Sequence, residues 1–481
     1  MAGTRQDIAS LDGPWSDTMI WYARAVGAAR SLDLNVTTSW TYLAAIHGMN
    51  PQGWIDQNII PASTAVPSQQ EMRLMFNQCQ HAGWFFLPWH RGYLAAFEEI
   101  LGAWIAAQGG PADWALPYWN YLNASDPNAR NIPQEFLDAT IPGDNVPNPL
   151  AQATRGPLTT LGPVPWTNGT DISLVSQSTN SVYTAIPGTL GYGGPISGFN
   201  QSGNAYGAIE NNPHNFVHVM IGGDNSPQPA GWMYDPDFAA LDPIFWVHHC
   251  NIDRLWAAWM TDANNGQEAS IHWRNGPFPR QFTMPSSTAN LVTFTPEDTL
   301  PGARLAPTYD NLSSGTGIAP TVGVAMATAS QPSGRASSLI GANAAPLSIT
   351  DTEAVASLSF SPTPPPVALA LAAAPKERLY LNVEGVRGIG ASGVVTVRVS
   401  APASDDAFSE TIAFFGLGKA TSTEGPHAGN GLSATIEITD KVRDMQGQDG
   451  ATITELEVRL AQSGGSSSEI TVDRLSLFSL R

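Results

Sequence analysis

Seven of the nine histidines in this chain of 481 residues fall into two clusters. Histidine is the commonest metal-binding side chain, so this concentration is hard to explain by packing alone. The two sets are His47, His81 and His90, and His214, His218, His248 and His249. Each set offers three imidazoles at spacings that can close around one ion. The sequence therefore predicts a site for two metal ions, and a fold that brings distant segments together around it.

The second cluster can be placed by helical geometry. His214 and His218 are four residues apart, a spacing that puts both rings on one face of a helix. His249 lies in a later stretch, which opens as a second helix at Asp242. His248 and His249 are about 100° apart around that helix, so we expect only one of them to bind the ion. Three neutral imidazoles from two helices suit copper or zinc.

The first cluster requires a break between two of its members. His81 and His90 are nine residues apart and would lie on opposite faces of one unbroken helix. Pro88 disrupts a helix at this point, so His90 can begin a new helix while His81 reaches in from the preceding segment. His47 follows an apolar run and would come from a helix of its own. We expect these three histidines to share the other ion.

Composition indicates a globular protein with an acidic surface. Hydrophobic residues make up 42% of the chain, enough for a large core, and the formal net charge is −19. An acidic surface disfavours nucleic acid and anionic membranes as partners. Met1 to Leu34 contains no basic stretch followed by a continuous apolar run, and no window approaches the roughly 18 apolar residues of a membrane span. We expect a protein that is cytoplasmic or otherwise soluble, without a signal peptide in this chain.

The pattern along the chain changes once and divides it into three parts. Residues 1–310 are rich in aromatic side chains and contain helical stretches such as Thr18–Arg30 and Arg91–Ala107. Residues 311–375 are rich in Ser, Ala and Pro, which is typical of a linker. Residues 376–481 show apolar side chains at every second position, which predicts a separate antiparallel β domain. The clearest alternation is at Leu379, Leu381 and Val383, at Val395, Val397 and Val399, and at Leu456, Val458 and Leu460.

Two stretches around the histidines resemble the type 3 copper family, which comprises tyrosinases, catechol oxidases and haemocyanins. His81 to Glu98 (HAGWFFLPWHRGYLAAFE) is similar to the family's first copper signature, and Asp242 to Asp253 (DPIFWVHHCNID) is similar to its second. The resemblance covers about residues 15–310. It implies a mainly α catalytic domain, with a four-helix bundle core around a dicopper site and with O2 as co-substrate.

The resemblance also assigns the histidines to two copper ions. In the second signature the ligand is the histidine followed four residues later by aspartate, which selects His249 over His248. The implied ligands are therefore His47, His81 and His90 for one copper ion and His214, His218 and His249 for the other.

Both cysteines stand beside clustered histidines. Some members of the family join a cysteine to the second ligand of the first copper by a thioether, and Cys79 stands two residues before His81 as that arrangement requires. A free buried thiol and a disulfide to Cys250 are the alternatives. Cys250 itself is expected to be a packed thiol.

Three further residues match positions that the family uses. A glutamate in a Glu-Asn-x-Pro-His setting is proposed there to hold a water that takes the phenol's proton, and Glu210 has that setting. Asn215, directly after a copper ligand, would help to position this water and favours monophenol hydroxylation. Pro236 falls near the gate position over the second copper. Glu210 could also be an ordinary capping or surface carboxylate, and Asn215 could simply hydrogen-bond locally.

The β domain resembles the one that follows the catalytic core in plant polyphenol oxidases, where it covers the copper site in a latent form. The similar stretch runs from Ala434 through Asp473. The resemblance suggests that the chain's own C-terminal domain is a lid, and that activity requires its removal or displacement. Phe414 and Phe415 are candidate residues for plugging the site.

Together these features predict a polyphenol oxidase of the tyrosinase or catechol oxidase type. Its substrates would be small phenols, with monophenols hydroxylated and o-diphenols oxidised to o-quinones. A catechol oxidase without hydroxylation, an o-aminophenol oxidase and a haemocyanin-like oxygen carrier are the alternatives. A dinuclear zinc hydrolase is disfavoured, because it would want bridging carboxylates or waters where this chain offers only histidines.

Overall fold

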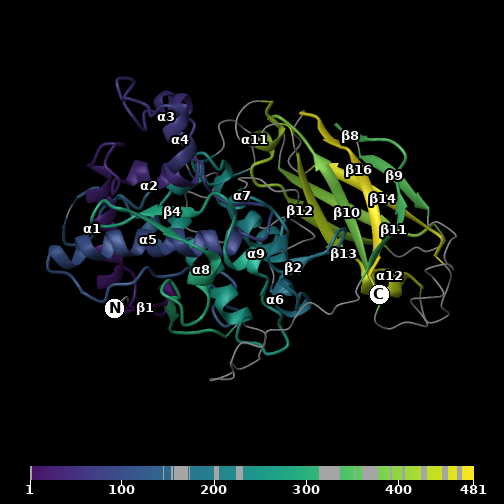
Figure 1. Ribbon diagram of the computed structural model, residues 1–481, viewed down its shortest axis with the longest axis horizontal. Coiled ribbons are helices and arrows are strands. Elements are labelled where there is room, and N and C mark those ends of the chain that lie inside the picture. The colour runs from purple at the N-terminus through teal and green to yellow at the C-terminus, as the bar shows by residue number, and fades with distance from the viewer. Residues whose placement is uncertain are drawn as a thin grey trace.

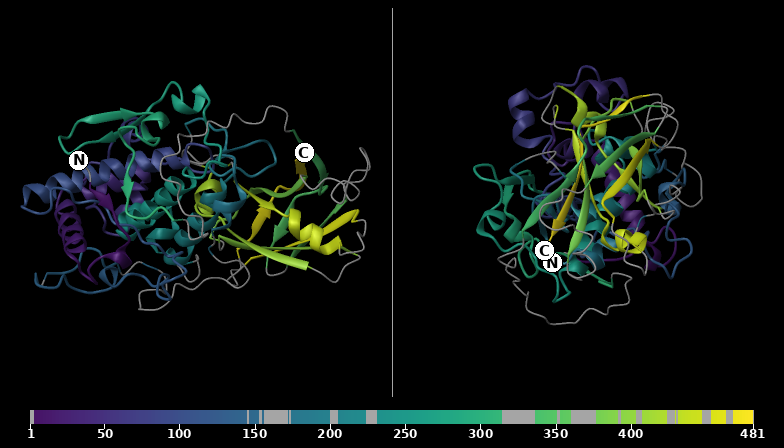
Figure 2. Two further views of the ribbon diagram at one scale, coloured as in Figure 1. Left: turned by 90° about the horizontal axis from the view of Figure 1, so that it is seen from below. Right: turned by 90° about the vertical axis from the view of Figure 1, so that its right-hand side faces the viewer.

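The longer helices and the two four-stranded sheets occupy separate parts of the molecule (Figure 1). The helical part runs from the N-terminus to Ser313, and the strands from Ser337 onward form a β domain beside it in Figure 1 and in the left view of Figure 2. This arrangement confirms the predicted fold class. The computed structural model describes residues 3–144, 146–152, 155, 172, 174–199, 205–223, 231–313, 336–350, 353–359, 377–390, 393–402, 407–423, 429, 431–446, 453–462 and 468–480.

Four helices of the helical part surround the histidines. Their neighbours α1 (Asp17–Arg30), α3 (Pro51–Asp56), α4 (Gln69–Met75), α6 (Val175–Thr179) and α9 (Ile271–Arg274) pack around them or lie in the connecting loops. The four helices are α2 (Trp40–His47), α5 (Phe86–Ala107), α7 (Phe216–Gly222) and α8 (Ile244–Trp259). Ser39 caps α2 by accepting a hydrogen bond from the backbone N of Tyr42.

Pro88 lies inside the first turn of α5 and does not interrupt a helix. The helix begins at Phe86, earlier than the predicted start near His90. Backbone N–H groups in the first turn have no partner within the helix, so a proline is tolerated there. The prediction was therefore wrong about the helix boundary. It was right that His81 precedes the helix and His90 lies within it.

A buried charge network and aromatic stacking fix α5 against α8. Arg91, next to His90, donates from Nε to Asp253 Oδ1 at 2.5 Å, and Arg5 donates from Nη1 to Asp253 Oδ2 at 3.1 Å. The rings of Phe97 and Trp246 stack with centroids 3.6 Å apart. Removing one partner from such a buried ion pair costs about 3–5 kcal/mol, so the two helices that carry these residues are held rigidly.

Short strands tie distant segments of the helical part together. The parallel pair β1 (Thr4–Arg5) and β6 (Thr308–Tyr309) joins the start of this part to its end. The remaining strand pairs are β2 (Thr184–Ala185) with β3 (Gly194–Pro195), and β4 (Phe282–Pro285) with β5 (Leu291–Phe294).

The β domain is a sandwich of two antiparallel four-stranded sheets. Their strand orders are β13-β10-β16-β7 and β12-β11-β14-β9, and a two-stranded β15-β8 pair lies beside them. The alternating residues predicted on three of these strands are all fully buried in one hydrophobic cluster between the sheets. The elements are β7 (Ser337–Ala342), β8 (Leu347–Ile349), β9 (Ala354–Ser359), β10 (Arg378–Val386), β11 (Val394–Ser400), β12 (Ala407–Ala413), α11 (Leu417–Thr421), β13 (Leu432–Glu437), α12 (Thr439–Gln446), β14 (Glu455–Gln462), β15 (Ile470–Val472) and β16 (Arg474–Leu480).

The predicted boundary between linker and β domain was wrong. Strands β7, β8 and β9 fall within the expected linker, residues 311–375, yet they pair with β16, β15 and β14. Strand β9 buries Ala354, Ala356 and Leu358 and exposes the residues between them, so it alternates as a strand should. Two of its three inward residues are alanines, which hides the alternation in a Ser/Ala-rich composition. The proline-rich end of the expected linker, residues 360–376, lies outside the described residues.

Side chains from each part enter the hydrophobic core of the other. Phe415 packs in the cluster of the helical part, whereas Tyr206 packs in the cluster of the β domain. Tyr206 Oη donates a hydrogen bond to the carbonyl oxygen of Phe415 at 3.0 Å. Gly188 has a φ of +76°, and a Cβ there would lie 2.3 Å from Cγ of Phe478, so the interface admits only glycine at this point. Within the described ranges, no helix has both the length and the hydropathy needed to cross a membrane.

Candidate metal centre

Each of the four central helices delivers one histidine to a common point. His47 ends α2, and His90, His218 and His249 lie on α5, α7 and α8. His81 precedes α5. His214 lies in an irregular turn, Glu210–Asn215, directly before α7. The rings of His214 and His218 are still neighbours, as predicted, because the backbone from Asn215 onward is already helical.

The rings form two adjacent triangles. The centroids of His47, His81 and His90 are 5.3, 5.4 and 5.8 Å apart, and those of His214, His218 and His249 are 4.5, 4.9 and 5.4 Å apart. The triangles meet where His90 stacks on His249 at 4.5 Å. The structure thus brings together all six histidines that the family resemblance assigns to copper.

Hydrogen bonds at Nδ1 hold four of these rings in fixed orientations. The acceptors are the carbonyl oxygens of Pro236 for His47 at 3.0 Å, Phe86 for His90 at 2.8 Å and Met233 for His218 at 2.9 Å, and Asn215 Oδ1 for His214 at 2.9 Å. An Nδ1–H that donates leaves Nε2 as a lone-pair donor, as in most histidine ligands of metals. Residues 233–237, which supply two of these carbonyls, are termed the acceptor loop below.

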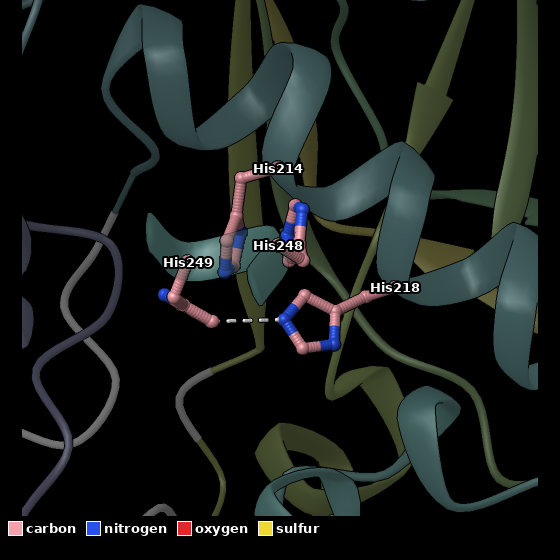
Figure 3. Close-up of side chains that lie close together, drawn as sticks. All are labelled: His214, His218, His248 and His249. Carbon is pink, nitrogen blue, oxygen red and sulfur yellow. Dashed lines mark hydrogen bonds between the residues drawn. The ribbon is translucent and has the colours of Figure 1, made fainter. Parts of the chain in front are cut away.

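The Nε2 atoms that remain fit metal ions. Those of His47, His90 and His214 are buried and have no hydrogen-bond partner among the described residues. His218 Nε2 and His249 Nε2 lie 3.2 Å apart (Figure 3). Two nitrogens bound to one ion at about 2.0 Å lie roughly 3 Å apart, so this separation is what a shared ion requires. Nitrogens of His214, His218 and His249 all lie within 4.8 Å of one another, and so do nitrogens of His47 and His81 together with Cys79 Sγ. Such buried, convergent donors suit copper or zinc.

Burial keeps these imidazoles neutral. It lowers the pKa of His47 and of His214 to about 3, and it lowers the pKa values of His90, His218 and His249 well below the usual value for histidine. Neutral imidazole is the form that binds metal.

The same shifts predict that metal-free protein loses stability in acid. The folded-state pKa values are depressed, so these histidines stabilise the fold above their unfolded pKa of about 6.5 and cease to do so as the pH falls towards 3. Between pH 6.5 and 5 we expect the unfolding free energy to fall by about 1.4 kcal/mol per pH unit for each such histidine. Thermal unfolding of metal-stripped protein at pH 7, 6 and 5 measures this slope. Copper-loaded protein is the control, and equal melting temperatures of the metal-free protein at pH 7 and 5 would contradict the prediction.

His248 lies closer to the second triangle than helical geometry alone suggests. Its ring is 5.4 Å from that of His214, and the nearest nitrogens of His214, His218, His248 and His249 all lie within 4.8 Å of one another (Figure 3). His248 Nδ1 is 3.0 Å from Tyr121 Oη. The 100° offset therefore does not separate His248 from the cluster, and the choice of His249 as ligand rests on the signature and on the His218–His249 contact.

Cys79 and Cys250 are not joined by a disulfide. Cys79 is buried, and its Sγ lies within 4.8 Å of ligand atoms of His47 and His81. That placement is compatible with the thioether to His81, which stays a prediction. Cys250 is buried on α8, and burial raises its pKa to about 12, so it is a packed and unreactive thiol.

Glu210 is buried, four residues before His214. Both of its carboxylate oxygens accept the backbone N–H of Ala82, the residue after His81, at 2.9 and 3.0 Å. Burial raises the pKa of Glu210 well above its ordinary value. Asn215 Oδ1 accepts a hydrogen bond from His214 Nδ1, whereas Asn215 Nδ2 is buried without a hydrogen-bond partner among the described residues. Glu210 therefore contacts the residue next to His81, and Asn215 keeps one donor without a partner among the described residues.

Pro236 lies beside the first triangle through its carbonyl contact with His47. Its ring faces the β domain, because a Cβ at Gly416 would lie 3.0 Å from Pro236 Cγ. A gate at Pro236 would thus be formed together with the lid.

Phe415 of the β domain covers the histidines. Its ring stacks on His218 with centroids 4.0 Å apart, and it meets His81 at 5.6 Å and His214 at 5.8 Å edge to face. Phe415 follows β12, and the alternation of the strand continues past its end, so Phe414 points into the β domain and Phe415 into the helical core. This alternation is visible in the sequence, so it could have predicted that Phe415, and not Phe414, faces the histidines.

Sequence reasoning missed the acceptor loop and its partner on the lid. Lys419 on α11 forms an ion pair with Asp237, at the end of the acceptor loop. The chain has three lysines, and none lies in residues 1–310, so a lysine just after Phe415 was a usable signal.

Comparison with known proteins agrees with this geometry. The sequence model of the common central domain of tyrosinase matches residues 37–262, which contain all seven clustered histidines. A second model, of a domain of unknown function (DUF7868), matches residues 336–480, the extent of the β domain in the structure.

One relative aligns over nearly the full chain, and another over half of it. Tyrosinase HcTyr1 of Hahella sp. (strain CCB-MM4) is 33% identical, over 99% of both chains. Polyphenol oxidase A1 of Vicia faba is 30% identical over 50% of this chain and 37% of its own. Latent apple tyrosinase shares the fold with a TM-score of 0.62 over 99% of this chain and 97% of its own, at 21% identity. With a full-length relative at this identity and a tyrosinase domain around the histidines, the chain belongs to the tyrosinase and polyphenol oxidase family of oxidoreductases.

Proposed function

We propose that this protein oxidises phenols with O2 at a pair of copper ions, and that its C-terminal domain keeps it latent. It would hydroxylate monophenols and oxidise o-diphenols to o-quinones. The observation that carries the proposal is the convergence of buried histidine nitrogens directly beneath the ring of Phe415. The full-length tyrosinase relative and the shared fold of latent apple tyrosinase support it.

The two triangles would hold one copper ion each, with His47, His81 and His90 on the first and His214, His218 and His249 on the second. When bound, the copper pair supplies the redox chemistry that couples reduction of O2 to oxidation of the phenol. The protein's part is to orient the ligands through their Nδ1 hydrogen bonds and to keep the site dry.

The ring of Phe415 marks where a substrate ring would bind. An aromatic ring at this place stacks on His218 and meets His81 and His214 by their edges. Substrate and plug therefore compete for one position, and the protein is latent while Phe415 occupies it. Pro236 packs against Gly416, the residue after Phe415. It would line the entrance once the lid is displaced.

Glu210 and Asn215 would handle the phenol's proton. The positive charge of bound copper lowers the pKa of a nearby carboxyl, which brings Glu210 back towards the range where it accepts a proton at neutral pH. The free Nδ2 of Asn215 can donate to a water held by Glu210. This pairing favours hydroxylation over diphenol oxidation alone.

Removing the charge of Glu210 should separate the two reactions. The assay uses copper-loaded chain, intact and cut between residues 313 and 337, with 4-methylphenol and 4-methylcatechol as substrates. We expect the intact chain to be slow and the cut chain to oxidise both. In the cut chain, Glu210→Gln should lower the 4-methylphenol rate roughly 100-fold, because general base catalysis contributes on that scale, and change the 4-methylcatechol rate only a few-fold.

Glu135→Gln is the matched control, because Glu135 is also a buried glutamate with a raised pKa but lies outside the site. If neither intact nor cut chain turns over either substrate, the oxidase proposal fails and an oxygen carrier becomes the better reading. Turnover of 4-methylcatechol alone would make the protein a catechol oxidase and would remove the roles proposed for Glu210 and Asn215.

A further inference from the structure

The acceptor loop, residues 233–237, holds one ligand of each proposed copper ion. The Met233 carbonyl accepts from His218 Nδ1 at 2.9 Å, and the Pro236 carbonyl accepts from His47 Nδ1 at 3.0 Å. The orientation of a histidine ligand depends on the partner of its second nitrogen. A displacement of this one loop would therefore disturb both metal ions.

The acceptor loop packs closely, backbone against backbone, on the helices that carry His47 and His218. Gly48 follows His47, and a Cβ there would lie 2.2 Å from the Pro236 oxygen. Gly222 ends α7, and a Cβ there would lie 2.1 Å from the backbone N of Tyr234. Both glycines permit contact between backbones, so movement of the loop is passed directly to α2 and α7.

The lid is attached to the same loop by charge. Lys419 Nζ forms an ion pair with Asp237 Oδ1, and only 17% of the lysine side chain and 12% of the aspartate side chain are exposed. Lys419 lies on α11, four residues after Phe415. The lid also touches the loop at Tyr234, whose Oη would lie 3.1 Å from a Cβ at Gly393.

Lys419 balances two neighbouring carboxylates of the loop. Burial, and then the charge of Asp237, raise the pKa of Asp235 to about 6, whereas Lys419 lowers it. The same two aspartates raise the pKa of Lys419 against the effect of burial. Without the lysine, the carboxylates of Asp235 and Asp237 would lose the cation that offsets them among the described residues, and their repulsion would displace the loop.

We infer that Lys419 is a positioning residue for the metal centre: its ion pair with Asp237 holds the acceptor loop, and through it His47 and His218, in the geometry that retains copper. The lid then has two separable functions. Phe415 excludes substrate, and Lys419 keeps the ligands in place. This inference rests on the proposed dicopper function.

Copper retention tests the inference without an activity assay. The full-length chain is loaded with two copper ions, mixed with excess EDTA, and the rate of copper release is followed. We expect Lys419→Met to raise this rate at least about tenfold, the scale on which outer contacts of histidine ligands affect metal affinity. Lys419→Arg should restore slow release. Lys441→Met, at an exposed lysine of the same domain, should leave the rate unchanged.

A second background separates positioning from simple closure of the lid. In the Phe415→Ala chain the plug is absent, so any effect that Lys419 exerts by holding the plug disappears. We expect Lys419→Met to accelerate release in this background as well, whereas no further acceleration there would overturn the inference.

Asp237→Asn removes the same ion pair by a change in the helical part and leaves the lid unaltered. It therefore tests the inference even if Lys419→Met unfolds the lid. It should release copper as fast as Lys419→Met does, and release at the wild-type rate would also overturn the inference. Failure of the proposed function shows in other measurements: the unaltered chain would not take up two copper ions or, once loaded with two, would not turn over 4-methylphenol and 4-methylcatechol after the cut.

Discussion

Phe415→Ala in the intact, copper-loaded chain is expected to raise the rate of 4-methylcatechol oxidation roughly tenfold to a hundredfold. Burying a phenylalanine side chain contributes about 1.5–3 kcal/mol, and each 1.4 kcal/mol changes an equilibrium tenfold. The ring of Phe415 contacts His218, His81 and His214. Its removal therefore destabilises the closed state by about that free energy. The alanine also leaves a space of about the size of a phenol at the place where the substrate must bind.

Phe408→Ala is the matched control for this experiment. Phe408 lies on β12 in the same domain and packs against the hydrophobic cluster of the β sandwich, away from the histidines. It tests whether loss of any lid phenylalanine loosens the domain. Should Phe415→Ala stay as slow as the unaltered chain while the cut chain is fast, a different part of the lid must block the site.

His249→Ala is expected to leave one copper ion per chain and to lower turnover more than about 1000-fold, which corresponds to over 4 kcal/mol of lost transition-state stabilisation. The reason is geometric. His249 Nε2 lies 3.2 Å from His218 Nε2, at the point where the second ion would bind, and the ring also stacks on His90 of the first triangle. Loss of this imidazole would remove a ligand and open a cavity between the two ions.

His248→Ala is the natural comparison, because the two histidines are neighbours on α8 and both are buried. His248 is held by Tyr121, so its loss should leave two copper ions per chain and most of the activity. Metal analysis of the two variants decides the assignment. If His248→Ala lost an ion and His249→Ala did not, the ligand set of the second site would have to be exchanged.

Local patterns in the sequence predicted much of the fold. The helix expected at Thr18–Arg30 forms at Asp17–Arg30, and the alternating valines of β11 are buried as expected. These features depend on residues close in sequence, whose periodicity can be read directly. The same holds for the family, because its two signatures are continuous stretches.

Contacts between distant segments could not be read in this way. Met233 and Pro236 act on the site through their carbonyl oxygens, which every residue has, so no side-chain pattern announces them. Strand β9 was hidden because alanines fill its inward positions. Its assignment depends on pairing with β14, almost 100 residues further along the chain.

The parallel pairing of β1 with β6 has a consequence for the order of events during synthesis. Arg5 and Tyr309 both bind Asp253, the carboxylate that also holds Arg91 beside His90, so the helical part can close only after Tyr309 has left the ribosome. Phe415 follows about 100 residues later, and at roughly 5–20 residues per second this takes about 5–20 s. For that interval the histidines of the nascent chain would have neither Phe415 nor Lys419 against them, so the proposed copper site would be open while the acceptor loop is not yet held by the β domain.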